Sequence, residues 1–186
     1  FVIGLTGRAG CGKSTVAAHW ESSRSIHTID LDRIGHECLK ESAIIKKCVA
    51  TFGDTILVDG HIDRSKLRQI VCQRSEALTQ LNTIIHPQIN RTVTQQLSLV
   101  DKTTVIIGAL IDEIGLRDCC DVMVVIDRSD TDTLSSKPTL LDILPLQRRA
   151  ESYRESANHV LQNNGTQSNL LKNADELFDS LDVGNT

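Results

Sequence analysis

The chain has 186 residues, of which 40% are hydrophobic and 24% are charged, the usual balance of a globular domain with a real core. The formal net charge is −4 and aromatic residues make up 3%, which argues against the basic face and the stacking surfaces of a nucleic-acid binder. The six cysteines form no C-x-x-C pair, which argues against a zinc site or a disulfide framework and favours free thiols in a reducing cytoplasm.

The first predicted strand, Val2–Thr6, leads directly into a glycine-rich loop, Gly7–Ser14, that fits the pattern G-x-x-x-x-G-K-[ST]. A helix-like stretch, Ser14–Trp20, follows. Glycines let the backbone bend so that its N–H groups surround phosphate oxygens, and the helix N-terminus adds partial positive charge there. Lys13 is expected to reach the β- and γ-phosphates of a nucleotide, and the Ser14 hydroxyl to hold Mg²⁺. The predicted nucleotide-binding residues are Gly10, Cys11, Gly12, Lys13, Ser14 and Thr15; a plain glycine turn is the alternative.

The second predicted strand, Ile26–Ile29, is followed by a pair of carboxylates, Asp30 and Asp32. Residues i and i+2 of an extended segment face the same side, so both carboxylates are expected at the carboxyl edge of the sheet, where ligands of such sheets bind. One of them can accept a proton from an attacking hydroxyl or hold Mg²⁺ through water. The alternative is a helix N-cap for a segment beginning at Arg33, because Asp is favoured there. The spacing leaves both interpretations open.

The next stretch, residues 33–99, is too long for a simple crossover and is predicted to be mostly helical. Its apolar residues recur at intervals of three or four, at Leu78, Leu81, Ile85, Ile89, Val93 and Leu97. Pro87 suits the first turn of a new helix, and Asp59-Gly60 predicts a tight turn. We interpret the stretch as a helical subdomain inserted beside the phosphate site.

Three further strands are predicted, Val105–Ile107, Val122–Ile126 and a weaker one, His159–Gln162. The first two are nearly continuous apolar runs, which is typical of strands covered on both faces. Because helical segments lie between the strands, we expect an α/β fold with a mainly parallel sheet. The polar segment Arg128–Lys137 is interpreted as a mobile loop that Pro138 ends.

The last predicted helix covers about residues 169–181. Its apolar residues share one face and are Leu170, Leu171, Ala174, Leu177, Phe178 and Leu181. The apolar runs are too short to span a bilayer, and the first residues are interpreted as a strand rather than a signal peptide.

Several short motifs also follow one another along nearly the whole chain. They are Ile3-Gly4-Leu5-Thr6-Gly7 with Gly10-Cys11-Gly12-Lys13-Ser14-Thr15; Ile29-Asp30-Leu31-Asp32 with Ile34-Gly35-His36-Glu37; Phe52-Gly53; Asp59-Gly60-His61-Ile62-Asp63-Arg64 with Leu67; Leu81-Asn82 with Ile85-His86-Pro87; Leu110-Ile111-Asp112-Glu113 with Gly115-Leu116; and Gln147, Ala157-Asn158 and Asn163-Asn164-Gly165. In this combination the chain resembles the dephospho-coenzyme A kinase family.

The resemblance implies a fold, a reaction and its ligands. The fold is a three-layer α/β P-loop kinase, a single domain with its core at residues 1–32, 100–127 and 157–186, an inserted helical acceptor subdomain at 33–99 and a short lid at about 128–150. The reaction transfers the γ-phosphoryl group of ATP, with Mg²⁺, to the ribose 3′-hydroxyl of dephospho-CoA, the last step of coenzyme A synthesis. The implied partners are these small molecules, without nucleic acid or membrane. The implied location is cytoplasmic, and the oligomeric state is left open.

The resemblance also implies roles for individual residues. Asp32 is the general base at the acceptor hydroxyl, and Lys13 acts on the nucleotide. Arg64 binds substrate; the alternative is a surface ion pair with a nearby aspartate. His86 lies beside the acceptor pocket, the alternative being a residue at the start of a helix. Glu113 is near the bound substrate, the alternative being a charge on a loop.

The lid departs from the family pattern. Residues 131–137 stand where members usually carry Q-x-x-R-[LV]-x-x-R, and both expected arginines are absent. Such arginines stabilise charge on the transferring phosphoryl group and help to exclude water, so a slow kinase is expected. The candidates to replace them are Arg128, Lys137, Arg148 and Arg149. The alternative functions are another small-molecule P-loop kinase, or a divergent nucleotide- or CoA-binding module with weak phosphotransfer.

Overall fold

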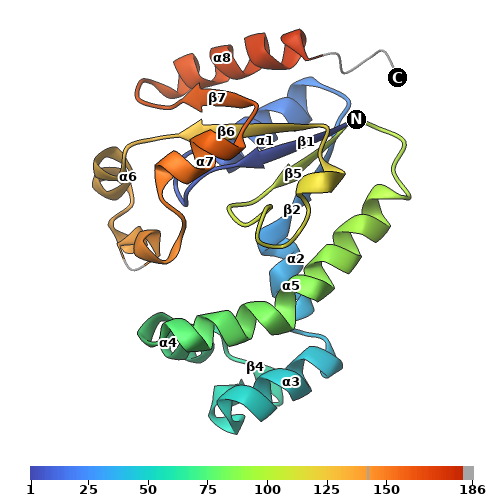
Figure 1. Ribbon diagram of the computed structural model, residues 1–186, viewed down its shortest axis with the longest axis vertical. Coiled ribbons are helices and arrows are strands. Elements are labelled where there is room, and N and C mark those ends of the chain that lie inside the picture. The colour runs from blue at the N-terminus through green and yellow to red at the C-terminus, as the bar shows by residue number, and fades with distance from the viewer. Residues whose placement is uncertain (142, 182–186) are drawn as a thin grey trace. The chain divides into compact units, whose positions relative to one another are not determined.

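The computed structural model describes residues 1–141 and 143–181, and the chain forms two compact units. The first unit joins Phe1–Asp30 to Gln96–Thr186 and contains the main sheet, whereas the second, Leu31–Gln95, is mostly helical (Figure 1). Because the boundary follows Asp30, the neighbouring Asp32 belongs to the second unit.

Five parallel strands form the sheet of the first unit, in the order β2-β5-β1-β6-β7. They are β1 (Val2–Thr6), β2 (His27–Asp30), β5 (Thr104–Ile107), β6 (Val122–Asp127) and β7 (His159–Gln162). β1 pairs in parallel with β5 and β6, so the loop that follows β1 leaves from the middle of the sheet. The five predicted strands and their parallel arrangement are confirmed, and the strand ends differ by no more than one residue.

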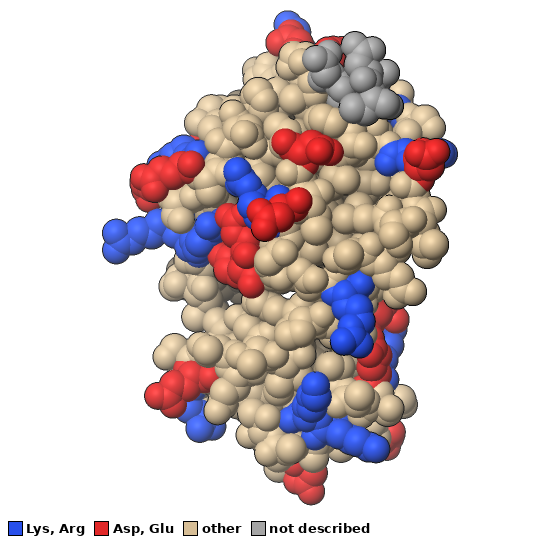
Figure 2. Space-filling model, turned by 45° about the vertical axis from the view of Figure 1, so that its right-hand side comes forward, with Lys and Arg blue, Asp and Glu red and all other residues tan. Residues whose placement is uncertain are grey.

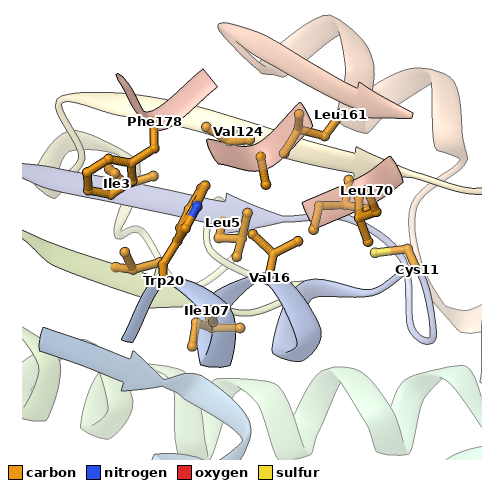
Figure 3. Packing of buried hydrophobic residues seen from close by; sticks show 14 of the residues in the cluster. Ile3, Leu5, Cys11, Val16, Trp20, Ile107, Val124, Leu161, Leu170 and Phe178 are labelled. Atoms are coloured by element: carbon orange, nitrogen blue, oxygen red, sulfur yellow. The ribbon is translucent and has the colours of Figure 1, made fainter. Parts of the chain in front are cut away.

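One face of the sheet packs against α1 (Lys13–Ser23) and α8 (Gln167–Ser180) (Figure 3). The rings of Trp20 and Phe178 meet edge to face, with centres 5.1 Å apart. The side chain of Cys11, in the glycine-rich loop, is 2% exposed and belongs to the same core, so the core anchors the loop. The predicted apolar face of the last helix is confirmed: Leu170, Ala174 and Phe178 are buried, and Leu171, Leu177 and Leu181 are partly buried against this core.

The opposite face of the sheet presents the alternate side chains of the strands, including the buried Ile106 and Met123. The short helix α7 (Ala150–Ser156) lies along β6 (Figure 1) and buries Tyr153, whose hydroxyl donates a hydrogen bond to the carbonyl oxygen of Ala109 at 2.8 Å. The loop after β5 contains the turn η2 (Arg117–Cys119). Both faces of the sheet are therefore covered, as the continuous apolar strands predict.

The segment after β6 is folded, so the predicted loop at Arg128–Lys137 was wrong. The helix α6 (Asp130–Ser136) begins after Ser129, whose hydroxyl accepts a hydrogen bond from the backbone N–H of Asp132 at 3.1 Å. This N-cap and the acidic first turn favour a helix that Ser, Thr and Asp disfavour by propensity alone. α6 ends at Ser136, and Pro138 opens a short 3-10 helix, η3 (Pro138–Leu140), which η4 (Leu144–Leu146) follows.

Helices and one hairpin make up the second unit. They are α2 (Leu31–Cys38), α3 (Ser42–Phe52), η1 (Asp54–Ile56), β3 (Leu57–Val58), β4 (His61–Ile62), α4 (Arg64–Gln73) and α5 (Ser75–Leu97). Asp59 and Gly60 form the two-residue turn of the hairpin with φ values of 50° and 79°, a left-handed conformation that glycine adopts freely and aspartate tolerates. The predicted turn is confirmed. The buried core of this unit consists of Ile44, Cys48, Ile56, Leu67, Val71 and Ala77.

Pro87 lies inside α5 rather than in the first turn of a new helix, so that prediction was wrong. A proline removes one backbone hydrogen bond from the helix interior. The helix continues because Ile85, Ile89 and Val93, on both sides of the proline in sequence, are buried at helical spacing.

Asp30 and Asp32 do not share an extended segment, because β2 ends at Asp30 and α2 begins at the next residue. Asp32 is an exposed residue in the first turn of α2, whereas Leu31 and Ile34 are buried. The prediction that both carboxylates lie on one extended segment was therefore wrong. The helix begins two residues before Arg33, where the N-cap alternative expected it, so Asp30 is the residue that directly precedes it.

Charges of both signs are interspersed on the face shown in Figure 2, in line with the small net charge of −4. Exposed ion pairs include Lys40–Glu37, and each such pair stabilises the fold by at most about 1 kcal/mol. Within the described residues, none of the helices is both long and apolar enough to cross a membrane.

Candidate active site

The glycine-rich loop joins β1 to α1 at the carboxyl edge of the sheet. Gly7 has a φ of 131°, and a side chain there would bring its Cβ to 2.4 Å from the carbonyl oxygen of Ile126. Only glycine fits this approach to β6. The loop ends at Gly12, whose carbonyl accepts the first hydrogen bonds of α1 from Thr15 and Val16, both at 3.1 Å. The sequence thus forms the strand–loop–helix geometry that the motif predicts.

Lys13 and Ser14 occupy the first turn of α1. The ammonium group of Lys13 donates hydrogen bonds to the carbonyl oxygens of Gly7 at 2.8 Å and Arg8 at 2.9 Å, so it lies over the loop. Ser14 is exposed, and its hydroxyl makes no hydrogen bond within the part of the chain that the structure describes. No acidic residue lies in this first turn, which leaves the positive end of the helix available to an anion.

Residues far away in the sequence hold the loop. Asn163, just after β7, donates from its side-chain amide to the carbonyl oxygen of Cys11 at 2.7 Å. The backbone N–H of Ala9 donates to the side-chain oxygen of Gln147 at 2.8 Å. Arg8 forms an ion pair with Asp130 of α6. Sequence reasoning assigned no function to these contacts, although Gln147 and Asn163 are part of the motif series.

Arg8 also donates to the carbonyl oxygen of Leu144. The segment from α6 to α7 therefore contacts the loop through the side chains of Asp130 and Gln147 and the carbonyl oxygen of Leu144. This is the segment predicted as the lid.

Two cavities border the loop. The first, of about 250 Å³, is here named the loop cavity and is lined by Gly10, Gly12, Thr15, Arg128, Ser136, Lys137, Asn163, Gly165, Gln167 and Leu170. The second, of about 510 Å³, is named the arginine cavity and is lined by Arg8, Asp127, Arg128, Ser129, Asp130, Arg149, Ala150, Glu151, Arg154 and Asn164. Arg128 lines both.

Glu113 lies in the loop after β5, where it is tied to the start of α7. Arg148 forms ion pairs with Glu113 at 2.9 Å and with Asp112 at 2.8 Å, and its guanidinium lies over the Tyr153 ring. Burial alone lowers the pKa of Arg148, but Glu113 and Asp112 outweigh burial and raise it, so the guanidinium stays charged. Burial, and then the charge of Glu113, raise the pKa of the Tyr153 hydroxyl, which stays protonated.

The other predicted site residues belong to the second unit. Asp32 is in the first turn of α2, Arg64 begins α4 and His86 lies on α5. Asp63 caps α4 by accepting hydrogen bonds from the backbone N–H groups of Ser65 at 2.8 Å and Lys66 at 3.2 Å. Within the described residues Arg64 forms no ion pair, so the alternative of a pair with a nearby aspartate is not supported.

A cavity of about 490 Å³ opens between α2, α4 and α5 within the second unit, and we name it the α4 cavity. It is lined by His36, Leu39, Arg64, Ser65, Leu67, Arg68, Val71 and Leu81. Arg64 and Arg68 lie one helical turn apart on α4, and the described lining contains no carboxylate. The cavity therefore combines positive charge with an apolar wall. His86 is not part of its lining, and sequence reasoning missed Arg68 and His36 as partners of Arg64.

A central parallel strand that feeds a phosphate-binding loop and a helix defines the class of P-loop phosphotransferases. The dephospho-CoA kinase of Campylobacter jejuni has the same fold, with a TM-score of 0.74 at 22% identity over 100% of this chain and 98% of that chain. The family model described as dephospho-CoA kinase (CoaE) matches residues 1–169, and the chain belongs to this family. The fold class and the family predicted from the sequence are confirmed.

The chain is also similar to individual members of the family. It is 36% identical to the dephospho-CoA kinase of Psychrobacter arcticus over an alignment of 153 positions, which covers 79% of this chain and 66% of that enzyme. It is 29% identical to the dephospho-CoA kinase of Fusobacterium nucleatum over an alignment of 191 positions, which covers 97% of this chain and 98% of that enzyme. As a family member the chain is a phosphotransferase with an alcohol group as acceptor, and membership supports ATP-dependent phosphorylation of dephospho-CoA in coenzyme A biosynthesis.

Proposed function

We propose that the chain transfers the γ-phosphoryl group of ATP to the ribose 3′-hydroxyl of dephospho-CoA, releasing coenzyme A and ADP. The observation that carries this proposal is the phosphate-binding loop between β1 and α1, with Lys13 over the loop and the Ser14 hydroxyl exposed beside it, in a chain that the family matches over residues 1–169. The proposed residue roles follow.

ATP binds with its phosphates in the loop formed by Gly10–Thr15. Backbone N–H groups and the N-terminus of α1 face the phosphate oxygens, and Lys13 moves from the loop carbonyls to the β- and γ-phosphates. The exposed Ser14 hydroxyl, which makes no hydrogen bond among the described residues, would hold the Mg²⁺ that accompanies ATP, and the ion would neutralise charge on the phosphates.

The second unit is the acceptor subdomain, and the α4 cavity receives part of dephospho-CoA. Arg64 and Arg68 pair with the pyrophosphate of the acceptor, because guanidinium groups suit phosphate oxygens and the cavity lining offers them no carboxylate. The apolar wall, which includes Leu67 and Val71, accommodates the uncharged arm. His86 and Glu113 complete the acceptor side as the resemblance implies.

In the chemical step Asp32 accepts the proton of the 3′-hydroxyl as the oxygen attacks the γ-phosphorus. The new bond between this oxygen and the γ-phosphorus forms in line with the bond from the γ-phosphorus to the β,γ-bridging oxygen. That second bond breaks, and its electron pair stays on the oxygen of the departing ADP. A general base contributes about 10²–10⁴-fold to such a step. The exposed position of Asp32 in the first turn of α2 leaves its carboxylate accessible to a substrate hydroxyl.

Two expectations about the setting belong to the same proposal. The segment at about residues 128–150 acts as the lid, which its contacts with Arg8 and Ala9 support. The enzyme works in the cytoplasm, which its six free cysteines support, because thiols persist in a reducing compartment.

The test is to incubate the protein with Mg-ATP and dephospho-CoA and to follow coenzyme A and ADP by mass spectrometry. Equal amounts of both products are expected, and none without the acceptor. A higher rate with adenosine or AMP as acceptor would identify another small-molecule kinase. Binding of both ligands without any product would make the chain a nucleotide- or CoA-binding module, the alternative that the missing lid arginines favour.

A further inference from the structure

The segment from Arg128 to Arg149 contains four cationic side chains that the sequence offers as replacements for the missing lid arginines. The structure gives them different surroundings. Arg148 pairs with Asp112 and Glu113 in the loop after β5 and lies over the ring of Tyr153 in α7. Because two carboxylates neutralise its positive charge, this side chain attracts a nucleotide phosphate only weakly. Arg148 therefore positions that loop instead of binding phosphate.

Arg128 lines three cavities, which are the loop cavity, the arginine cavity and a third cavity of about 340 Å³ that includes Asn163 and Gly165. Its backbone is fixed on both sides, because β6 ends at Asp127 and the N-cap of α6 is Ser129. In the described part of the chain its guanidinium has no hydrogen bond or ion pair.

The loop cavity is also lined by Lys137, the residue after α6, and by Gly12 and Thr15. None of its described lining residues is a carboxylate, so the two positive charges are not neutralised inside the cavity. An anionic ligand that reaches Gly12 meets both of them. A nucleotide with its phosphates in the loop is such a ligand.

The arginine cavity is different because its lining includes carboxylates, each of which pairs with an arginine. Asp127 binds Arg154 at 2.7 Å, Glu151 binds the same side chain at 3.0 Å, and Asp130 binds Arg8. Arg149 is exposed at the rim of this cavity and does not line the loop cavity. The loop cavity is thus the more favourable place for an anion.

We propose that Arg128, assisted by Lys137, is the cationic wall of the nucleotide site and takes the place of the family's lid arginines in this chain. Arg128 acts from the rigid end of β6, so this contact does not depend on closure of a lid. The identity of the nucleotide rests on the proposed function, but the placement of the wall rests on the cavity and its unpaired charges. Arg128 accordingly determines nucleotide affinity, and Arg149 does not.

The experiment is calorimetric titration with ADP, in the presence of Mg²⁺, of the parent and of Arg128→Ala, Arg128→Lys, Lys137→Ala and Arg149→Ala. Arg128→Ala is expected to raise the Kd for ADP at least tenfold, Arg128→Lys less, and Lys137→Ala severalfold. Arg149→Ala, the matched control from the same segment, stays within twofold of the parent. If Arg128→Ala does not fold by circular dichroism, Arg128→Gln is judged by the same criterion.

The proposal is overturned if Arg128→Ala, or Arg128→Gln in its place, binds ADP within twofold of the parent, or if Arg149→Ala weakens ADP binding as much as the Arg128 variant does. The titration needs no acceptor, so it separates this inference from the proposed function. If the parent forms no coenzyme A but the Arg128 variant binds ADP more weakly, the proposed activity is wrong and the cationic wall is retained. If the parent forms coenzyme A and the Arg128 variant binds ADP as tightly as the parent, the proposed activity is retained and the cationic wall is wrong.

Discussion

The guanidinium carbon of Arg148 lies 4.4 Å from the centre of the Tyr153 ring. The hydroxyl of the same tyrosine donates a hydrogen bond to the carbonyl oxygen of Ala109 at 2.8 Å, and Nη2 of Arg148 donates to Asp112 at 2.8 Å. Arg148, just before α7, and Tyr153, within α7, therefore each bond to the loop after β5. Arg148 is thus a structural residue, and its removal is expected to lower the free energy of unfolding.

Arg148→Met is expected to lower the free energy of unfolding by about 1–3 kcal/mol, because it leaves the partly buried carboxylates of Asp112 and Glu113 side by side without their cation. Thermal unfolding measures this loss. Arg149→Met, an exposed neighbour without an ion pair in the described chain, is the control and should unfold at the parent's temperature. An unchanged Tm in Arg148→Met would contradict the assignment.

Lys13→Ala is expected to weaken ATP binding by at least tenfold, about 1.4 kcal/mol, and to abolish detectable turnover. The fold should persist, since among the described residues the Lys13 ammonium bonds only to the carbonyl oxygens of its own loop and the thiol of Cys11. Calorimetry and thermal unfolding check the two statements separately. ATP binding as tight as in the parent would remove the phosphate-site assignment.

Asp32→Asn is expected to lower kcat by about 10²–10⁴-fold, because a carboxamide cannot accept the proton of the acceptor hydroxyl. The KM values for both substrates should change far less. Glu37→Gln, another exposed acid of α2 that pairs only with Lys40 among the interactions described, is the matched control and should retain kcat. A normal kcat for Asp32→Asn together with a lower Tm would assign the residue to the helix instead of the chemistry.

Arg64→Ala and Arg68→Ala are each expected to raise the KM for dephospho-CoA about tenfold or more while the Kd for ADP stays within twofold, because both line the α4 cavity of the second unit. Lys66→Ala is the control, since Lys66 lies between them on α4 but is not part of that lining. Steady-state kinetics with each substrate varied in turn provides the readout. Equal effects on nucleotide and acceptor would be incompatible with an acceptor role for the cavity.

The α1–α8 contact predicts a pH dependence of stability. Burial tends to raise the pKa of Asp175, but hydrogen bonds from His19 at 2.8 Å and Arg24 at 3.3 Å outweigh it and lower the pKa. A carboxylate with a lowered pKa stabilises the fold above its unfolded pKa of about 3.9, and this contribution disappears as the pH falls through the folded pKa.

Asp175→Asn should therefore lower Tm relative to the parent at pH 7, by no more than about 4 °C since both partners are partly exposed. The difference should shrink as the pH falls through the folded pKa of Asp175. Asp101→Asn, an exposed acid without an ion pair among the described residues, should leave Tm unchanged at neutral and acidic pH. A difference that persists at low pH would show that packing, rather than charge, links the helices.

The sheet and the phosphate-binding loop could be predicted because their signals are local. Continuous runs such as Val122–Ile126 indicate buried parallel strands, and the spacing of Gly7, Gly12 and Lys13 indicates the loop. The helix α6 could not be predicted from composition, because one capping hydroxyl, that of Ser129, offsets a run of poor helix formers. The new helix predicted to start at Pro87 was wrong for a related reason, since burial of neighbouring residues keeps α5 continuous.

The partners of the candidate site residues were harder to predict than the residues themselves. Arg68 and His36 lie beside Arg64 only because α2 and α4 border one cavity, which no spacing in the sequence reports. Arg148 was equivalent to Arg149 in the sequence, and ion pairs to Asp112 and Glu113 separate the two. The motif identifies chemistry, whereas the free or engaged state of each charge depends on tertiary contacts.

The hydrogen bond from Asn163 to Cys11 joins residues 152 positions apart, and the one from Ala9 to Gln147 joins residues 138 positions apart. The phosphate-binding motif is therefore synthesised long before the groups that hold it in shape. A nascent chain that stops before β7 carries the whole motif without the hydrogen bond from Asn163. Nucleotide binding is therefore expected to appear only after β7 and Asn163 have been made.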